Sequence, residues 1–162
     1  MHIRSASTSD LDRIMEIYAR AQRFMRETGN PTQWSNVYPT RELIEGDIAS
    51  RTSYVVTDDA GTVQGVFVFA VGADKTYAVI RGGAWKNDDS YGTIHRIASG
   101  GEVRGVFGAA IDYCKSRIGN LRIDTHENNR VMQHLIAKNG FVFCGHITAE
   151  DGTDRLAYQY TK

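Results

Sequence analysis

The chain has 162 residues, enough for one domain with a sizeable core and too few for two of ordinary size. Apolar residues make up 41% and charged residues 23%, which is the composition of an ordinary globular protein. Its 19 basic residues balance 19 acidic ones, so no net charge draws it to nucleic acid or an anionic membrane. We therefore expect one domain over residues 1–162, with neither nucleic acid nor membrane as a partner.

The two cysteines, Cys114 and Cys144, lie far apart and form no C-x-x-C motif. Neither a disulfide framework nor a structural zinc site is expected, and no other metal site is indicated. Cys144 alternates with Phe141 and Phe143, which is typical of a small buried side chain. No N-terminal stretch resembles a signal peptide and no run approaches membrane-spanning length, so we expect a cytoplasmic protein with reduced thiols.

The first predicted elements are a short strand at residues 2–6 and a long helix capped by Thr8 or Ser9. Apolar side chains recur along this helix at helical spacing, and Gly29-Asn30-Pro31 ends it. The residues of this apolar face are Leu11, Ile14, Tyr18, Ala21 and Met25. One face of the helix is therefore expected to pack on the core.

The middle of the chain predicts a loop, a short helix, a hairpin and a third strand of the same meander. The turn sequence Asp58-Asp59-Ala60-Gly61 joins the two hairpin strands. A second loop follows. The ranges in chain order are 32–39, 40–50, 53–58 with 63–72, 76–80 and 82–90.

The second half alternates strands and helices before ending on two further strands. Its predicted ranges are strand 91–99, a stretch over 100–120 that starts with glycines and becomes helical, strand 121–125, helix 128–140, and strands 141–147 and 155–160. Phe107, Ala110, Ile111, Cys114 and Ile118 form a regular apolar stripe on the first of these helices. The mixture predicts an α+β domain with a mixed, largely antiparallel twisted sheet of about six to seven strands, flanked by helices.

The stretch RIDTHENNRVMQHLIAKNGF, residues 122–141, combines several residue types at fixed spacing. Asn129 opens a helix, Met132 and Leu135 follow three and six residues later, and Lys138-Asn139-Gly140-Phe141 closes it. In this register the chain resembles the GCN5-related N-acetyltransferase (GNAT) superfamily. The order of the predicted elements is similar to that of the family, which implies the GNAT acyl-CoA N-acyltransferase fold.

The turn before the second-half helix carries a weaker match to the family. GNAT proteins have a Gln/Arg-x-x-Gly-x-Gly/Ala loop there, and the aligned run is EVRGVF, residues 102–107. Gly105 keeps the central glycine, whereas Glu102 and Phe107 depart from the pattern. Backbone N–H groups that lead into a helix N-terminus form an anion site, which suits the pyrophosphate of acetyl-coenzyme A (acetyl-CoA).

The resemblance implies that acetyl-CoA is the cofactor. A strand around residues 95–98 would supply backbone groups to its pantetheine arm, the loop would hold its pyrophosphate, and the Asn129 amide would reach it. The cofactor-binding residues expected on this basis are His95, Arg96, Ile97, Ala98, Gly101, Glu102, Val103, Arg104, Gly105, Val106, Phe107 and Asn129.

The activity that the resemblance implies is N-acetylation of the primary amine of a small or amino-acid-like acceptor, by direct transfer in a ternary complex. Such an amine must lose a proton to a base. Asp124 matches an acidic position that serves as the base in some members, and His95 titrates near neutral pH. Tyr91 and His126 share strand faces with them, and all four have structural alternatives, as packed or hydrogen-bonded anchors. Ile136 replaces a tyrosine that many members use as the acid.

Three loop aromatics, Trp34, Tyr38 and Trp85, are expected to bind the acceptor, or alternatively to pack over helix ends. A second function stays open, a non-catalytic CoA-binding module of the same fold, and the departures at Glu102, Phe107 and Ile136 favour it. A dinucleotide-binding protein is disfavoured because no G-x-G-x-x-G follows a strand. An exposed sheet edge near the C-terminus allows a homodimer.

Overall fold

The computed structural model describes residues 1–35 and 37–162; Asn36, in the predicted loop 32–39, lies outside the described residues. Seven strands, four α-helices and two short 3-10 turns make up the described chain. The strands are β1 (His2–Ser5), β2 (Ser53–Thr57), β3 (Val63–Val71), β4 (Gly92–Ser99), β5 (Asn120–Thr125), β6 (Val142–Thr148) and β7 (Asp154–Thr161). The helices are α1 (Leu11–Glu27), α2 (Arg41–Ala49), α3 (Val106–Arg117) and α4 (Arg130–Lys138), and the 3-10 turns are Thr8–Asp10 and Lys75–Tyr77.

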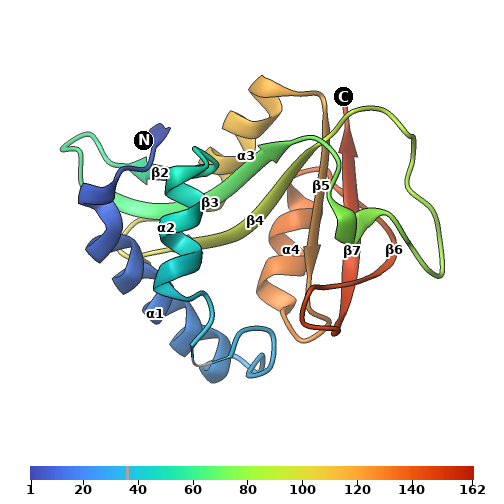
Figure 1. Cartoon of the computed structure of the whole chain (residues 1–162), viewed down its shortest axis with the longest axis horizontal. Coiled ribbons are helices and arrows are strands. Elements are labelled where there is room, and N and C mark those ends of the chain that lie inside the picture. The colour runs from blue at the N-terminus through green and yellow to red at the C-terminus, as the bar shows by residue number, and fades with distance from the viewer. Residues whose placement is uncertain (36) are drawn as a thin grey trace.

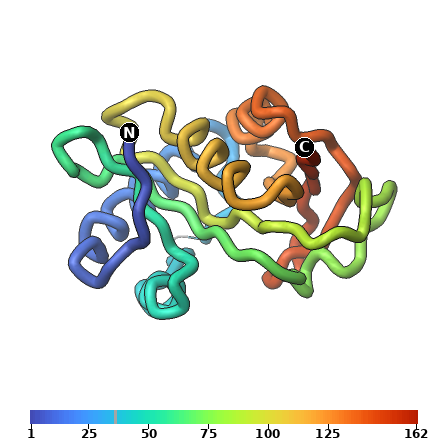
Figure 2. Tube along the Cα trace, turned by 90° about the horizontal axis from the view of Figure 1, so that it is seen from above, coloured from blue at the N-terminus to red at the C-terminus, as the bar shows by residue number. Residues whose placement is uncertain are grey.

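The strands form one sheet in the order β1-β2-β3-β4-β5-β7-β6. Every neighbouring pair is antiparallel except β4 and β5, which run parallel. Helices α1 and α2 cover one face of the sheet, and α3 and α4 cover the other (Figures 1 and 2). The predicted mixed, largely antiparallel sheet flanked by helices is confirmed. Because β7 lies between β5 and β6, the exposed edge near the C-terminus is β6.

Two apolar layers hold the helices to the sheet, because successive strand residues point to opposite faces. Val55 packs beneath α1 and α2 in a cluster with Ile14 and Ile17, whereas Val56 packs beneath α3 and α4. The stripe predicted on α3 supplies the second layer through Phe107, Ala110, Ile111 and Cys114, all buried. The apolar spacing along each helix therefore sets which side of that helix is buried against the sheet.

The first helical segment begins one residue earlier than expected. The backbone N–H of Ser7 donates to the Asp10 carboxylate at 2.9 Å, and the Asp10 N–H donates to the Ser7 carbonyl. Arg4 forms a two-point ion pair with Asp10 at 2.8 Å. The predicted cap at Thr8 or Ser9 is therefore wrong, because the reach of Asp10 back to Ser7 starts a 3-10 turn there.

The third meander strand predicted at residues 76–80 is also wrong. The Asp74 carboxylate accepts hydrogen bonds from the N–H and hydroxyl of Thr76, which begins the 3-10 turn Lys75–Tyr77 instead. The ring of Tyr77 is buried in a third apolar cluster with Tyr91 and Ile147. Arg81, just after this segment, forms an isolated antiparallel bridge with His146 of β6, and residues 76–80 are in no strand.

Strands β4 and β5 part half-way along β4. Their pairing covers Gly92 to Ile94 on β4 and stops at Ile94 opposite Ile123. Immediately beyond, β4 bulges against β3, and Arg96 takes a left-handed backbone with a φ of 48°. The bulge bends the strand, so the sheet has an opening at its centre.

No helix in the described ranges combines the length and apolar character needed to cross a membrane.

Candidate active site

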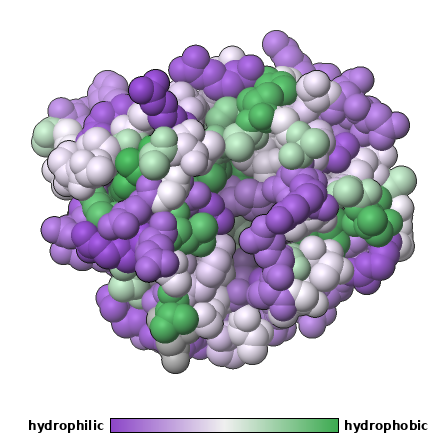
Figure 3. All heavy atoms as spheres, viewed as in Figure 1, coloured by the Kyte–Doolittle hydropathy of each residue, from purple (hydrophilic) through white to green (hydrophobic). Residues whose placement is uncertain are grey.

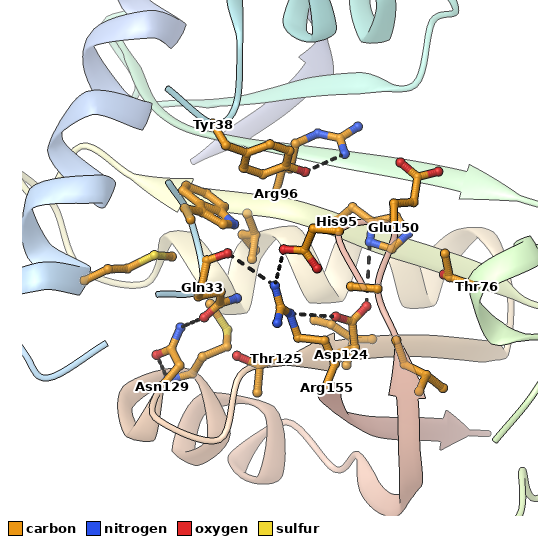
Figure 4. Close-up of a pocket in the computed structure, with 18 of the residues that line it drawn as sticks. Gln33, Tyr38, Thr76, His95, Arg96, Asp124, Thr125, Asn129, Glu150 and Arg155 are labelled. Carbon is orange, nitrogen blue, oxygen red and sulfur yellow. Dashed lines mark hydrogen bonds and ion pairs between the residues drawn. The ribbon is translucent and has the colours of Figure 1, made fainter. Parts of the chain in front are cut away.

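A cavity of about 750 Å³ occupies the opening between β4 and β5. Its walls come from the loop between α1 and α2, the segment after β3, the middle of β4, the end of β5, the start of α4 and the segment from β6 to β7. The face drawn as spheres in Figure 3 is hollowed near its centre, where hydrophilic side chains gather. Figure 4 shows the labelled lining residues converging from these elements.

The cavity is lined from both faces of the sheet. Ile123 belongs to the apolar layer beneath α3 and α4, whereas the next residue, Asp124, contacts Tyr77 on the opposite face. By strand alternation Thr125 returns to the α4 side, where Asn129 and Met132 also line the cavity. The opening therefore passes through the sheet, with a different set of side chains at each end.

Three ionisable side chains, Asp74, His95 and Asp124, lie in a row at one end of the cavity. His95 Nε2 lies 2.8 Å from the Asp74 carboxylate, and His95 Nδ1 lies 3.8 Å from Asp124 Oδ2. The Tyr77 hydroxyl donates to the same Asp124 oxygen at 2.6 Å. The sequence suggested Asp124 and His95 separately, and the fold brings them together.

The surroundings of Asp74 and Tyr77 fix the charge that each of these two side chains carries. The hydrogen bond from His95, aided by Thr76, holds the pKa of Asp74 well below its usual range. Burial, with the adjacent charge of Asp124 as a smaller cause, raises the pKa of Tyr77 well above its usual range. Asp74 is thus an anion and Tyr77 a hydrogen-bond donor throughout the physiological pH range.

Arg155 projects into the middle of the cavity wall (Figure 4). Its Nε lies 4.0 Å from Asp124 Oδ1, and its Nη2 lies 3.5 Å from Asp151 and donates to the Gln33 carbonyl at 3.2 Å. The guanidinium is buried and already surrounded by acceptors. Its charge is therefore balanced within the wall, and Glu150 adds a further carboxylate at the rim.

Two of the predicted catalytic residues do not line the cavity. The Tyr91 hydroxyl accepts a hydrogen bond from the Asp74 backbone N–H at 2.8 Å, so Tyr91 positions the loop that carries Asp74. His126 lies in the turn after β5, where its Nδ1 accepts from the Asn128 N–H at 3.0 Å. Burial and Arg155 lower its pKa. The turn thus occupies one ring nitrogen of His126.

Two of the three aromatics proposed for the acceptor line the cavity. Trp34 and Tyr38 pack edge to face with ring centroids 5.8 Å apart, and the Tyr38 hydroxyl accepts from Arg96 at 3.3 Å. Trp85 lies elsewhere. It packs on Tyr77 and on the Arg122 guanidinium, and its indole N–H donates to the Tyr77 carbonyl. Its loop closes over the third apolar cluster, which is why it does not reach the cavity.

The expected cofactor residues divide into two groups. His95, Arg96, Ile97 and Asn129 line the cavity, whereas Ala98 is buried under α1 and the run 101–107 lies outside it. The backbone carbonyl of Arg96 accepts a hydrogen bond from the Tyr18 hydroxyl at 2.8 Å, and the Arg96 guanidinium is paired with Asp47. Asn129 Oδ1 accepts from the Met132 N–H, and Nδ2 donates to Gln33.

The loop before α3 has the character of an anion site. Gly101 and Gly105 have positive φ values of 76° and 86°, and the N–H groups of residues 102–105 have no partner among the described residues. The Arg20 guanidinium occupies the position that a Cβ on Gly101 would take. Arg13 pairs with Glu102 at 2.9 Å, which offsets the charge of Glu102. The loop therefore fits a phosphate group of CoA.

Comparison with known structures identifies the family. A GNAT-family acetyltransferase from Streptococcus agalactiae 2603 is 32% identical to this chain, with a TM-score of 0.89 over 99% of this chain and 95% of that one. The chain belongs to the GNAT family of acetyltransferases. A putative acetyltransferase from Staphylococcus aureus MU50 is 27% identical, with a TM-score of 0.71 over 99% of both chains.

More distant GNAT structures share the fold. A GNAT phosphinothricin acetyltransferase from Sinorhizobium meliloti, solved in complex with acetyl-CoA, is 16% identical with a TM-score of 0.66, over 99% of this chain and 87% of that one. Acyl-CoA is thus a cosubstrate within the family. No family sequence model matches the chain, and no curated protein matches it in sequence.

Sequence reasoning did not identify Asp74, Thr125 or Arg155 as residues that line the cavity, nor Tyr77 as a partner of Asp124. Tyr77 comes from the segment expected to continue the meander, Asp74 lies just before that segment, and Arg155 lies in a predicted strand. Tertiary contacts between Tyr77 and Asp124, 47 positions apart, place these groups together. No local pattern marks any of the four, because their partners are distant along the chain.

Proposed function

We propose that this acetyltransferase is an acetyl-CoA-dependent N-acetyltransferase that acts on the primary amine of a small molecule. The observation that supports it best is the chain of Asp74, His95 and Asp124 at one end of a cavity that passes between β4 and β5. The loop before α3, with its free N–H groups, supports acetyl-CoA as the donor.

The charges of the cavity wall suit an amine that arrives as an ammonium ion. Four carboxylates line it, those of Asp74, Asp124, Glu150 and Asp151, and its two arginines are each paired with carboxylates. Opposite charge attracts and orients the ammonium. A free amino acid is a less suitable acceptor, because no unpaired cation of the described wall is left for its carboxylate.

Asp124 is the proposed general base. Its carboxylate accepts the amine proton directly or through a water, and the adjacent His95, hydrogen-bonded to the Asp74 anion, can pass that proton on. The Tyr77 hydroxyl fixes the orientation of Asp124. General base catalysis of this kind contributes about 10²- to 10⁴-fold to a rate.

Transfer is proposed to be direct, from acetyl-CoA to the amine within a ternary complex. Neither cysteine lines the cavity, and Cys114 is fully buried in the α3 layer. Burial raises the pKa of the Cys114 thiol to about 12, so it is not a thiolate at neutral pH. A cysteine-bound acetyl intermediate is therefore not part of the proposal.

Two assays in sequence test the proposal. Thermal unfolding with acetyl-CoA, with ATP and NAD as controls, should show stabilisation by acetyl-CoA alone, about 2.7 kcal/mol at a hundred times Kd. A panel of monoamines, diamines and amino acids is then screened for amine-dependent CoA release, and the amines without a carboxylate should be the better acceptors. Binding of acetyl-CoA without release by any amine would instead indicate the non-catalytic CoA-binding module.

A further inference from the structure

The side chain of Thr125 has an unsatisfied hydroxyl at the wall of the cavity. Thr125 is fully buried and lines the cavity at the last position of β5, and its Oγ1 has no hydrogen-bond partner among the described residues. A buried hydroxyl without a partner destabilises the fold. Such a group at the wall of a binding cavity indicates a partner supplied by a ligand.

The position of Thr125 determines which ligand atoms it can meet. It follows Ile123, the last β5 residue paired with β4, so it lies beside the opening of the sheet. Its alternation with Asp124 turns it to the α4 face, opposite the proposed base (Figure 4). The Asp124 carboxylate and the Thr125 hydroxyl therefore lie on opposite sides of any group that occupies the gap between β4 and β5.

The inference rests on the proposed function. We propose that the Thr125 hydroxyl donates a hydrogen bond to the thioester sulfur of acetyl-CoA and stabilises the thiolate as it leaves. As the amine nitrogen bonds to the acetyl carbon, the C–S bond breaks and its electron pair stays on sulfur. The amine proton goes to Asp124, and the thiolate is protonated from solvent after release. Negative charge thus develops on the Thr125 side while the proton leaves on the other.

The neighbouring helix supplies no hydroxyl at this end. Ile136, on α4, is fully buried in the apolar layer and carries no polar group. The Asn129 amide commits one of its two N–H donors to Gln33. Thr125 is therefore the hydroxyl of the α4 face that is free to donate, among the described lining residues.

The chain offers a matched control for this hydroxyl. Thr93 is also a buried strand threonine whose Oγ1 has no partner, but it lies on β4 outside the cavity. Thr125→Val and Thr93→Val remove the same group with the same change of shape, and Thr125→Ser keeps the hydroxyl. Thermal unfolding of each variant without ligand checks that it folds.

The first readout is binding without turnover, by titration calorimetry with CoA and desulfo-CoA from about pH 7 to about pH 10, because ionisation of the CoA thiol over the alkaline part of this range charges the sulfur. The wild-type protein and Thr93→Val should prefer CoA by about tenfold, as expected for one hydrogen bond to a charged sulfur. Thr125→Val should bind both ligands equally. Wild-type protein with no preference would overturn the role of Thr125, whereas no affinity for either ligand would overturn the proposed function itself.

The second readout is turnover with acetyl-CoA and an accepted amine. Thr125→Val should lower kcat about tenfold with little change in the KM of the amine, and Thr125→Ser should stay within about threefold of wild type. Equal losses of kcat in Thr125→Val and Thr93→Val would mean that packing, rather than the hydrogen bond, is responsible, and would overturn the inference.

Discussion

Replacing Asp124 with asparagine tests the proposed base most directly. The substitution keeps the shape of the side chain and an oxygen that can accept the Tyr77 hydrogen bond, but it removes the charge and the basicity. The expected fall in kcat is at least about 100-fold, equivalent to about 2.7 kcal/mol in the activation barrier.

The structure also indicates why the fold should survive this change. Asp124 lies 4.0 Å from the Arg155 guanidinium, and a charge pair at that distance interacts by about 4 kcal/mol at an effective dielectric constant near 20. Arg155 keeps Asp151 at 3.5 Å and the Gln33 carbonyl, and the desolvation of a buried carboxylate is relieved. We therefore expect a net loss of about 1–2 kcal/mol in the free energy of unfolding.

The assay is amine-dependent CoA release at saturating acetyl-CoA, measured from acidic to alkaline pH, with Tyr77→Phe as the matched variant. Tyr77→Phe keeps the carboxylate and removes one donor to it, so its kcat should fall less, by about tenfold. The kcat of Tyr77→Phe should stay above that of Asp124→Asn across this pH range. An Asp124→Asn enzyme within about threefold of wild type would refute the base assignment.

Substitutions at three further positions test other parts of the structure. Asn129→Ala should lose the α4 cap on the Met132 N–H, which lowers the free energy of unfolding by about 1 kcal/mol, and it should also weaken CoA binding. Asn129→Asp should keep the cap and lose only CoA affinity. Equal CoA affinity of the wild type and Asn129→Asp, measured by calorimetry, would contradict this. Gly105→Val should abolish CoA binding measured by calorimetry, because valine is strained at a φ of 86°; wild-type affinity in a folded variant would place the phosphate elsewhere. Arg4 is the main cause that holds the pKa of Asp10 at about 2, below its usual 3.8, so the folded state resists protonation of Asp10 more than the unfolded state does. The resulting stability of about 1 kcal/mol is present above pH 4 and should be lost as the pH falls toward 2; Asp10→Asn should remove that pH-dependent part in chemical unfolding, and an unchanged dependence would contradict it.

The sequence by itself determined the elements whose signals are local. The α3 stripe and the Asn129 cap of α4 were predicted because each depends on residues within a turn or two. The predicted shared face of Tyr91 and His95 agrees with the structure, since Tyr91, just before β4, and His95, on β4, both contact Asp74.

Only the tertiary structure decided how the candidate site is assembled. The separation of β4 from β5 beyond Ile94 depends on pairing between distant strands, which periodicity does not encode. The contacts of Asp74 with His95 and of Arg155 with Asp124 likewise join segments that have no local relation. Trp85 was wrongly expected at the cavity for a related reason. A loop aromatic has the same sequence signature whether it lines a cavity or covers a core. Local patterns fix elements over a few residues, whereas cavities form where chain-distant elements meet.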